Sequence, residues 1–282
     1  MSDLLDDYLN EYDPDTNYFD SHISENHVFS SYDSIDDFTS SNPTLLKDSS
    51  FISIISQNIR SFNKNQETFL LLFNENSFNP DCFIFSETWY DGYEPITIPN
   101  YNGFHTARED RRSGGVSIFV KDSLNSEIIN ELSYFNETIE ICTVKISNEN
   151  SHIFIIGVYR PHSGTIENFT LSLETILENQ TIIGADCMVG GDFNIDISSQ
   201  EGGPDYFLDM MHSHHMLQTI TGITRPSINN STGSLLDHIW INNISNYNSG
   251  IIKTGITDHH TTFILLPFIC KTNKNEKNKN FV

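Results

Sequence analysis

An acid and an amide follow two glycines in the stretch VGGDFNID, residues 189–196. Side chains two positions apart in an extended strand point to the same face of a sheet. Asp192 and Asn194 are therefore expected to face one spot, and Gly190 and Gly191 leave room there for a ligand or another backbone. A structural turn would also account for this stretch, so the other strand ends have to decide between a polar site and a turn.

Other polar side chains stand where apolar runs end. Glu87 closes the run DCFIFSE, residues 81–87, and a carboxylate in this position suits a hard cation. One such residue is usually structural, whereas several at one edge of a sheet would form a site. The others are Asn58 at the end of residues 51–59, Tyr159 at the end of residues 152–160, and Asp258 with His259 before residues 261–267.

Asp237 lies inside an apolar run, LLDHIWI, and shares a strand face with Ile239 and Ile241. An acid on an apolar face needs a partner, because burying an unpaired charge is costly. His259 is a chemically suitable partner, since an aspartate fixes the tautomer of an imidazole and stabilises its charged form. His238 points to the opposite strand face and is interpreted as structural.

The elements that must position these residues are mostly strands. Many strands with few helices between them favour two packed sheets with helices outside. Helices are predicted at residues 65–78, 165–179 and 203–216, and strands at residues 51–59, 81–87, 114–121, 139–146, 152–160, 186–194, 235–241 and 261–267.

The formal net charge of this 282-residue chain is −23, which counts against a generic nucleic-acid-binding protein. Residues 1–50 hold twelve acids and one lysine without a sustained hydrophobic period, and we predict a disordered arm there. The folded domain is predicted at residues 51–268, followed by a tail or linker rich in lysine and asparagine at residues 269–282. The sequence shows neither a membrane-spanning run nor a signal peptide, so we expect an intracellular protein that is not secreted and has no membrane partner.

Taken together and in order, the polar residues resemble the endonuclease–exonuclease–phosphatase superfamily. Over roughly residues 51–267 the chain is most similar to the apurinic-type endonuclease domain of non-LTR (LINE-like) retrotransposons. The resemblance implies an α/β (α+β) fold, namely a DNase I-like four-layer α/β/β/α sandwich of two mixed sheets. It also implies Mg²⁺, with Mn²⁺ as a substitute, and the nicking of DNA in the nucleus to prime a reverse transcriptase encoded downstream. The motifs are SQNIRSFN, PDCFIFSETWY, RRSGGVSIFVK, GVYRPHSG, VGGDFNID, TRP, SLLDHIWIN and TDHHTTFILL.

The resemblance implies a role for each residue of the site. His259, held by Asp237, would stabilise the negative charge on the phosphorane, and such electrostatic stabilisation is usually a large contribution to catalysis. Asp192 would orient or deprotonate the attacking water. The remaining roles are metal binding at Asn58, Glu87 and Asp258, positioning or contact of the phosphate at Tyr159 and Asn194, and substrate contact at Arg60 and Thr224.

Two alternative functions stay open. A phosphatase or phosphodiesterase of the same superfamily, acting on a lipid or nucleotide, would be hindered less by the acidic charge. An inactive, domesticated binding module that uses the acidic arm is the second alternative, and the intact set of polar residues argues against it. Since no reverse transcriptase follows in this sequence, we interpret the chain as a fragment, a truncated copy or a domesticated gene.

The stretch HSHH contains a further group of histidines, His212, His214 and His215. It lacks both the i, i+4 histidine spacing and the acid of a helical zinc site. We therefore interpret it as part of a surface helix.

Overall fold

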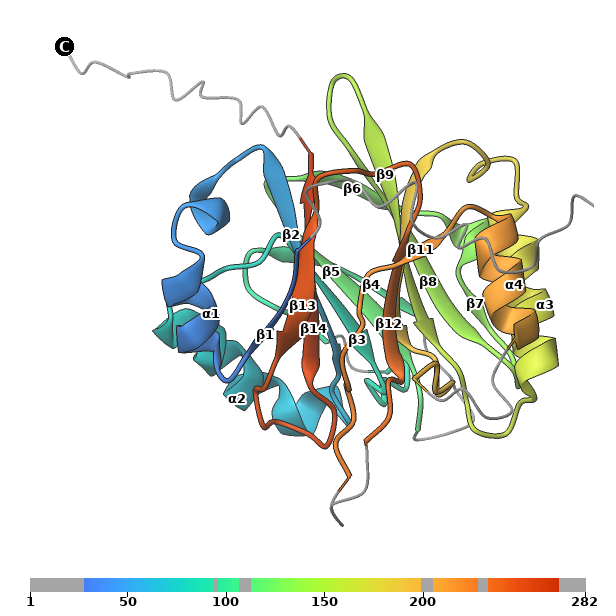
Figure 1. Ribbon diagram of the computed structural model, residues 1–282, viewed down its shortest axis with the longest axis horizontal. Helices are drawn as coiled ribbons and strands as arrows, with labels where there is room; N and C mark the ends of the chain where they lie inside the picture. Colours follow the sequence, from blue (N-terminus) through green and yellow to red (C-terminus); the bar gives the residue numbers. More distant parts are fainter. Residues whose placement is uncertain (1–27, 94–95, 107–112, 199–204, 228–232, 269–282) are drawn as a thin grey trace, which may run out of the picture.

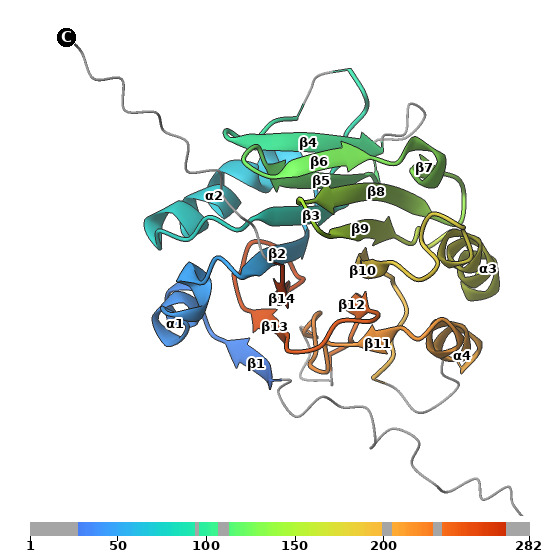
Figure 2. The same cartoon turned by 90° about the horizontal axis from the view of Figure 1, so that it is seen from above.

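The computed structural model describes residues 28–93, 96–106, 113–198, 205–227 and 233–268. In this part of the chain two seven-stranded sheets pack face to face, and helices cover their outer faces (Figures 1 and 2). This is the four-layer α/β/β/α arrangement that the sequence predicts. The first sheet is covered by α1 (Ile35–Ser41) and α2 (Phe62–Glu75), and the second by α3 (Ile166–Leu177) and α4 (Asp205–Ser213).

The first sheet has the strand order β1-β13-β14-β2-β3-β5-β4 and mixes parallel with antiparallel pairs. β2 and β3 are parallel neighbours at its centre, so their carboxyl ends lie side by side. Its strands are β1 (Val28–Tyr32), β2 (Phe51–Asn58), β3 (Cys82–Ser86), β4 (Tyr101–Thr106), β5 (Val116–Lys121), β13 (Asn248–Ile252) and β14 (Thr261–Pro267).

The second sheet has the order β11-β12-β10-β9-β8-β6, with β7 paired to β8. β9 and β10 are parallel, and β8 and β12 flank them in antiparallel orientation. Its strands are β6 (Asn125–Ile128), β7 (Tyr134–Phe135), β8 (Glu140–Ser147), β9 (His152–Tyr159), β10 (Asp186–Asp192), β11 (Leu217–Gln218) and β12 (Asp237–Ile241).

The core has one apolar layer between the sheets and one under each pair of helices. The central strands are buried on both faces, which explains why they read as continuous apolar runs in the sequence. Helix α3 begins where Thr165 accepts a hydrogen bond from the backbone of Asn168, and it buries Phe169, Leu173 and Leu177 against the second sheet. Burial of each such side chain contributes about 1.5–3 kcal/mol.

The amino-terminal part of the fold corrects the predicted arm. Strand β1 pairs in parallel with β13, and Phe38 of α1 is fully buried, with its ring centroid 4.7 Å from that of Phe263. The arm prediction is therefore wrong for residues 28–50, because a short helix can add to a core through two side chains, Ile35 and Phe38, without a long hydrophobic period. Residues 1–27 and the predicted tail at 269–282 lie outside the described residues.

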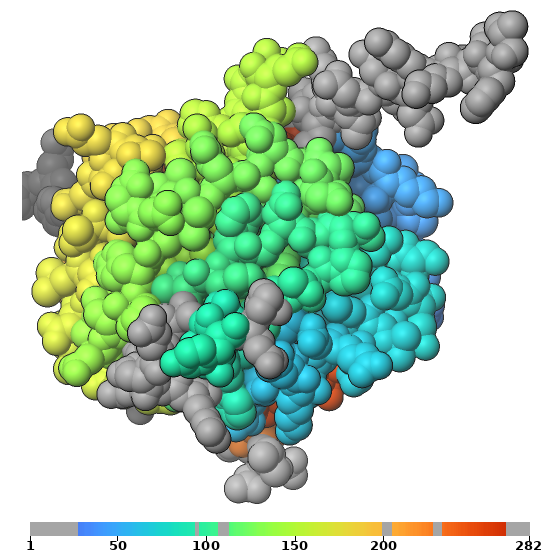
Figure 3. Space-filling model, turned by 180° about the vertical axis from the view of Figure 1, so that it is seen from behind, coloured from blue at the N-terminus to red at the C-terminus, as the bar shows by residue number. Residues whose placement is uncertain are grey.

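Viewed from behind, the surface is formed mainly by the middle of the sequence, from the cyan of α2 to the yellow-green of the α3 region (Figure 3). None of the helices in the described ranges combines the length and the apolar character that a membrane span requires. The ends of the central strands carry the polar residues of the candidate site.

Candidate active site

The strand register of the second sheet places four polar residues in one row. Glu140 of β8 is paired with Tyr159 of β9, Tyr159 with Asp192 of β10, and Asp192 with Asp237 of β12. Because side chains alternate along a strand, all four take the same side of the sheet, which faces the first sheet. The row is thus set by pairing of the backbone and not by a loop.

Asn58, at the end of β2, connects the first sheet to this row. Its Nδ2 donates hydrogen bonds to Glu87 Oε1 and to Asp192 Oδ2, each at 2.8 Å. The backbone N–H of Asn194 donates to the other oxygen, Asp192 Oδ1, at 3.0 Å. One amide group therefore holds two carboxylates close together, and such an arrangement favours a cation between or beside them.

Asp237 and His259 form a buried pair. Asp237 Oδ2 lies 2.8 Å from His259 Nδ1, and both residues are 3% exposed. Burial lowers the pKa of His259, but the charge and hydrogen bond of Asp237, aided by Asp192 and Asp258, outweigh it and raise the pKa to about 9. The imidazole is therefore cationic at neutral pH.

The same burial acts in the opposite direction on Asp192. Burial and the nearby charge of Asp237 raise the pKa of Asp192 to about 7, against the lowering effects of His259, Asn58 and Asn194. A carboxylate with this pKa exchanges a proton readily at neutral pH, which is the property of a general base.

A cavity of about 390 Å³ opens above this group. Asp192 is fully buried beneath it and does not line it. Gly115 N donates a hydrogen bond to Glu140 Oε2 in its wall. The residues that line the cavity include Arg60, Glu87, Glu140, Tyr159, Asn194, Arg225, Asp258 and His259.

The backbone around the cavity is strained at several residues. Glu87 has φ 51° and Asn194 has φ 49°, while Arg60, Ser61 and Trp89 have φ 43°, 82° and 56°. Residues other than glycine rarely take this left-handed conformation, which costs on the order of 1–3 kcal/mol at each position. Such strain persists only where the surrounding structure enforces it, and it concentrates at functional sites.

A family model described as the Endonuclease/Exonuclease/phosphatase family matches residues 42–259, which is most of the chain. The chain belongs to the endonuclease/exonuclease/phosphatase family. No curated protein sequence matches it.

Solved structures of this fold include nucleases and a phosphatase. The endonuclease domain of TRAS1, a telomere-specific non-LTR retrotransposon, is 13% identical, with a TM-score of 0.61 over 78% of this chain and 100% of that one. The AP endonuclease LMAP from Leishmania major is 14% identical, with a TM-score of 0.59 over 78% and 88%. A Neisseria 3' phosphatase, NExo, bound to a product DNA hairpin is 12% identical, with a TM-score of 0.54 over 76% and 99%. At these identities the likeness establishes the shared fold.

In this protein, most of the residues that the sequence singles out lie at or next to the cavity. Asn58, Glu87, Asp192 and Asn194 are joined by hydrogen bonds, and the Asp237–His259 pair that the sequence predicts is present. Tyr159, buried in the row, also lines the cavity. His238 is structural as expected, because its Nε2 contacts the backbone oxygens of Ile195 and Leu235, and burial lowers its pKa to about 4.

One predicted role needs correction, and the structure gives a second residue partners that the sequence does not indicate. Thr224 is fully buried, and its Oγ1 accepts hydrogen bonds from the backbone N–H groups of Leu236 and Asp237, so it cannot touch a substrate. Asp258 lines the cavity, and its Oδ1 pairs with Arg60 Nη1 at 2.7 Å and its Oδ2 with Arg225 Nη2 at 3.0 Å, while its role toward a metal stays a prediction. Burial raises the pKa of Asp258, but His259, Arg60 and Arg225 outweigh this and hold it below its usual value.

Sequence reasoning missed Arg160, which follows Tyr159. Its guanidinium donates to three backbone oxygens, those of Phe193, Asn194 and Gly164, at 2.8, 2.6 and 2.7 Å. Asn194 Nδ2 returns a hydrogen bond to Arg160 O at 2.8 Å. The arginine of the motif GVYRPHSG, which follows an apolar run, is visible in the sequence. Its three partners are backbone atoms, which the sequence does not single out.

Proposed function

We propose that this chain is a Mg²⁺-dependent phosphodiester hydrolase that nicks DNA, of the kind found in non-LTR retrotransposons. The observation that carries the proposal is the pair of carboxylates, Glu87 and Asp192, hydrogen-bonded to Asn58, together with a cationic, aspartate-bound His259; of these, Glu87 and His259 line the cavity. Attack on a phosphodiester adds negative charge to a group that is already charged, and cations or donors must offset it.

The residues present fit a hard divalent cation. Glu87 offers a carboxylate that lines the cavity, and its hydrogen bond to Asn58 fixes the orientation of that carboxylate. Oxygen donors of this kind suit Mg²⁺, which keeps several waters and binds through one or two carboxylates and substrate phosphates. When bound, Mg²⁺ would act as a Lewis acid on the phosphate oxygens. In this proposal Asn58 positions Glu87 and Asp192, and Asp258 organises two arginines instead of binding the metal.

The other residues that line the cavity or lie buried next to its lining have distinct tasks in the proposed reaction. His259 carries its proton at neutral pH and would donate a hydrogen bond to the phosphate oxygen that gains charge, while Asp237 holds its ring. Asp192 would take the proton of the attacking water. Tyr159 and Asn194 lie on the cavity wall, where they would contact the phosphate.

Two arginines offset the acidic charge of the protein at this place. The side chains of Arg60 and Arg225 are 51% and 40% exposed, and both line the cavity while they pair with Asp258. Exposed guanidinium groups are suited to the phosphates of a DNA backbone that flank the cleaved bond. These two guanidinium groups would give the DNA backbone cationic contacts on a chain whose net charge is −23.

A phosphatase of the same family is the second candidate. The fold similarity to the Neisseria 3' phosphatase and the acidic composition favour it. A terminal phosphate presents a small target, so it needs fewer contacts with a polyanionic backbone than an internal phosphodiester does.

Plasmid nicking tests the proposal. The purified chain should convert supercoiled plasmid to the open circle in Mg²⁺ and should be silent in EDTA. Glu87→Gln should mainly raise the Mg²⁺ concentration needed for half-maximal rate, because one ligand charge is lost. Glu67→Gln, which changes an exposed acid on α2, is the matched control and should behave as wild type.

The same preparations distinguish the two candidates. Release of phosphate from a 3'-phosphorylated oligonucleotide or an inositol phosphate, with the plasmid left intact, would replace the nuclease by the phosphatase. Activity that survives in EDTA would contradict both.

A further inference from the structure

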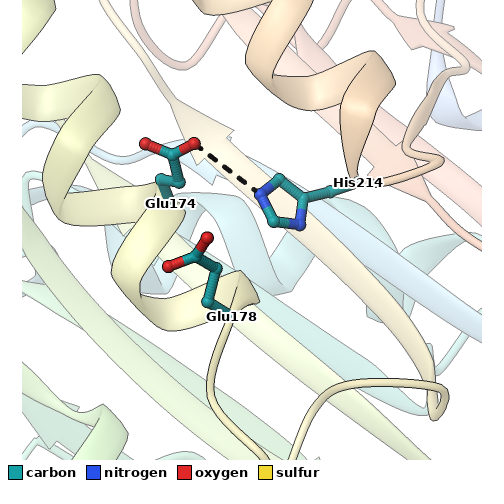
Figure 4. A group of neighbouring side chains, drawn as sticks. All are labelled: Glu174, Glu178 and His214. Carbon is teal, nitrogen blue, oxygen red and sulfur yellow. Dashed lines mark ion pairs between the residues drawn. The ribbon is translucent and has the colours of Figure 1, made fainter.

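A second group of carboxylates and histidine lies at the ends of the two helices that cover the second sheet. Glu174 lies in the last turn of α3, Glu178 follows the last residue of that helix, and His214 follows the last residue of α4. Each offers one ligand atom, and these atoms all lie within 4.8 Å of one another. Figure 4 shows the imidazole ring turned toward both carboxylates, with Glu174 Oε1 4.0 Å from His214 Nε2. None of the three lines the cavity described above.

The charges around this group are unfavourable without a cation. Glu178 is the C-cap residue of α3, and Glu174 lies in the preceding turn. The carboxyl end of a helix carries a partial negative charge, so acids there are destabilising, and two like charges at i, i+4 repel each other. The sequences of α3 and α4 contain no lysine or arginine to offset this charge. Among the described residues, His214 is the only ion-pair partner of Glu174.

We propose that Glu174, Glu178 and His214 form a binding site for a divalent transition-metal ion, with Zn²⁺ the best match. One imidazole nitrogen and two carboxylate oxygens suit Zn²⁺, with water as the fourth ligand. Mg²⁺ suits the site less well, because it prefers oxygen ligands in octahedral geometry.

The geometry needs only small side-chain movements to bind the ion. Zn²⁺ bonds of about 2.0–2.2 Å place neighbouring donors roughly 3.4 Å apart in a tetrahedron. Glu178 is exposed, and the side chains of Glu174 and His214 are 31% and 21% exposed, so their rotamers can close by the remaining ångström or so. The backbone is held in place, because His214 N donates to Met210 O and Glu178 N donates to Glu174 O.

This site includes one histidine of the HSHH stretch, which the sequence predicts to be part of a surface helix. His214 is the member that faces α3, whereas the ring of His212 lies 6.2 Å from that of Trp240, and His215 turns the chain with φ 57°. The acids that complete the site come from another helix, some 40 residues earlier in the chain. A bound ion would join α3 to α4 and neutralise two helix ends, so its role is structural and independent of the proposed nuclease.

Calorimetric titration of the whole chain with Zn²⁺ tests the proposal. His214→Gln should bind one equivalent of Zn²⁺ fewer than wild type, and Glu174→Gln should bind this equivalent at least tenfold more weakly. His215→Asn is the matched control, because asparagine tolerates the left-handed backbone, and it should keep the full stoichiometry. Zn²⁺ bound at the catalytic cavity is common to all these proteins and cancels in the comparison.

Thermal unfolding of Glu178→Gln gives a second readout. In EDTA the melting temperature of this variant should equal or exceed that of wild type, because an acid is removed from a helix end. With Zn²⁺ added, wild type should gain more in melting temperature than the variant, since a ligand stabilises the folded state that binds it. Equal Zn²⁺ stoichiometry and affinity in wild type and His214→Gln, or an equal Zn²⁺-induced gain in wild type and Glu178→Gln, would overturn the proposal.

Discussion

Two groups in this protein set carboxylates against a histidine, and they differ in nearly every physical respect. The mouth group consists of Asn58, Glu87, Asp192, Asp237 and His259. The helix-end group consists of Glu174, Glu178 and His214. In the mouth group the acid and imidazole atoms are 2.8 Å apart and nearly inaccessible to solvent. In the helix-end group they are 4.0 Å apart and partly exposed.

The comparison teaches that burial, and not residue type, decides what an acid–histidine pair can do. Charges shielded from water interact strongly, whereas an exposed pair contributes about 0–1 kcal/mol. The carboxylate oxygens of Asp192 also accept hydrogen bonds from the side chain of Asn58 and the backbone of Asn194, which fixes them before any substrate arrives. The mouth group is therefore preorganised, and the helix-end group is adjustable.

The largest expected difference between the groups is in catalysis. His259→Ala should lower the nicking rate by about 10²–10³, because a preorganised donor to the developing charge is lost. His214→Ala removes the same side chain from the helix-end group and should leave the rate unchanged. Single-turnover nicking of both variants measures the effect. Equal rates for wild type and His259→Ala would place the chemistry elsewhere.

Stability against pH should separate the groups next. The pKa of His259 is about 9 in the folded protein, against about 6.5 in an unfolded chain. The resulting stabilisation is fully present below the unfolded pKa and is lost as pH rises through the folded pKa.

Between pH 7 and pH 10 this loss amounts to roughly 2–3 kcal/mol of unfolding free energy. Urea denaturation at both pH values, compared with His259→Gln, isolates it from other groups that titrate. The wild type should lose more stability than the variant, and parallel losses would contradict the raised pKa.

Arg160 offers the smallest and most local test. Arg160→Gln removes a charged donor from the carbonyls of Phe193, Asn194 and Gly164, and the unfolding free energy should fall by about 1.5–3 kcal/mol. The nicking rate should also fall, since Asn194 loses its support. Arg160→Lys should recover little, because an ammonium group cannot reproduce the planar fork. Lys145→Gln, a surface change on β8, serves as the control.

The sequence predicts the buried strands well, because their long apolar runs leave few other interpretations. It also predicts the Asp237–His259 pair, since an acid on an apolar strand face needs a partner. It does not predict β1 and α1, whose contribution rests on a few side chains such as Phe38 and on pairing with the distant β13.

The sequence indicates the partners of the site residues less well than the residues themselves. The roles that the resemblance implies for Thr224 and Asp258 take no account of their partners. Thr224 accepts hydrogen bonds from two backbone N–H groups, and Asp258 pairs with two arginines, and these partners lie far away in the sequence or carry no side-chain signal. The acids of the helix-end group were missed for the same reason.

The polar row across β8, β9, β10 and β12 also bears on how the chain finds its fold. Strands β9, β10 and β12 are buried on both faces, so a slip of one residue in their pairing would exchange one mostly apolar face for another at little hydrophobic cost. The slip would, however, turn Asp192 or Asp237 away from its hydrogen-bonding neighbours and into an apolar layer, which is expensive for an acid. The residues proposed for catalysis thus also favour the correct strand register. A chain folded out of register would be inactive as well as less stable.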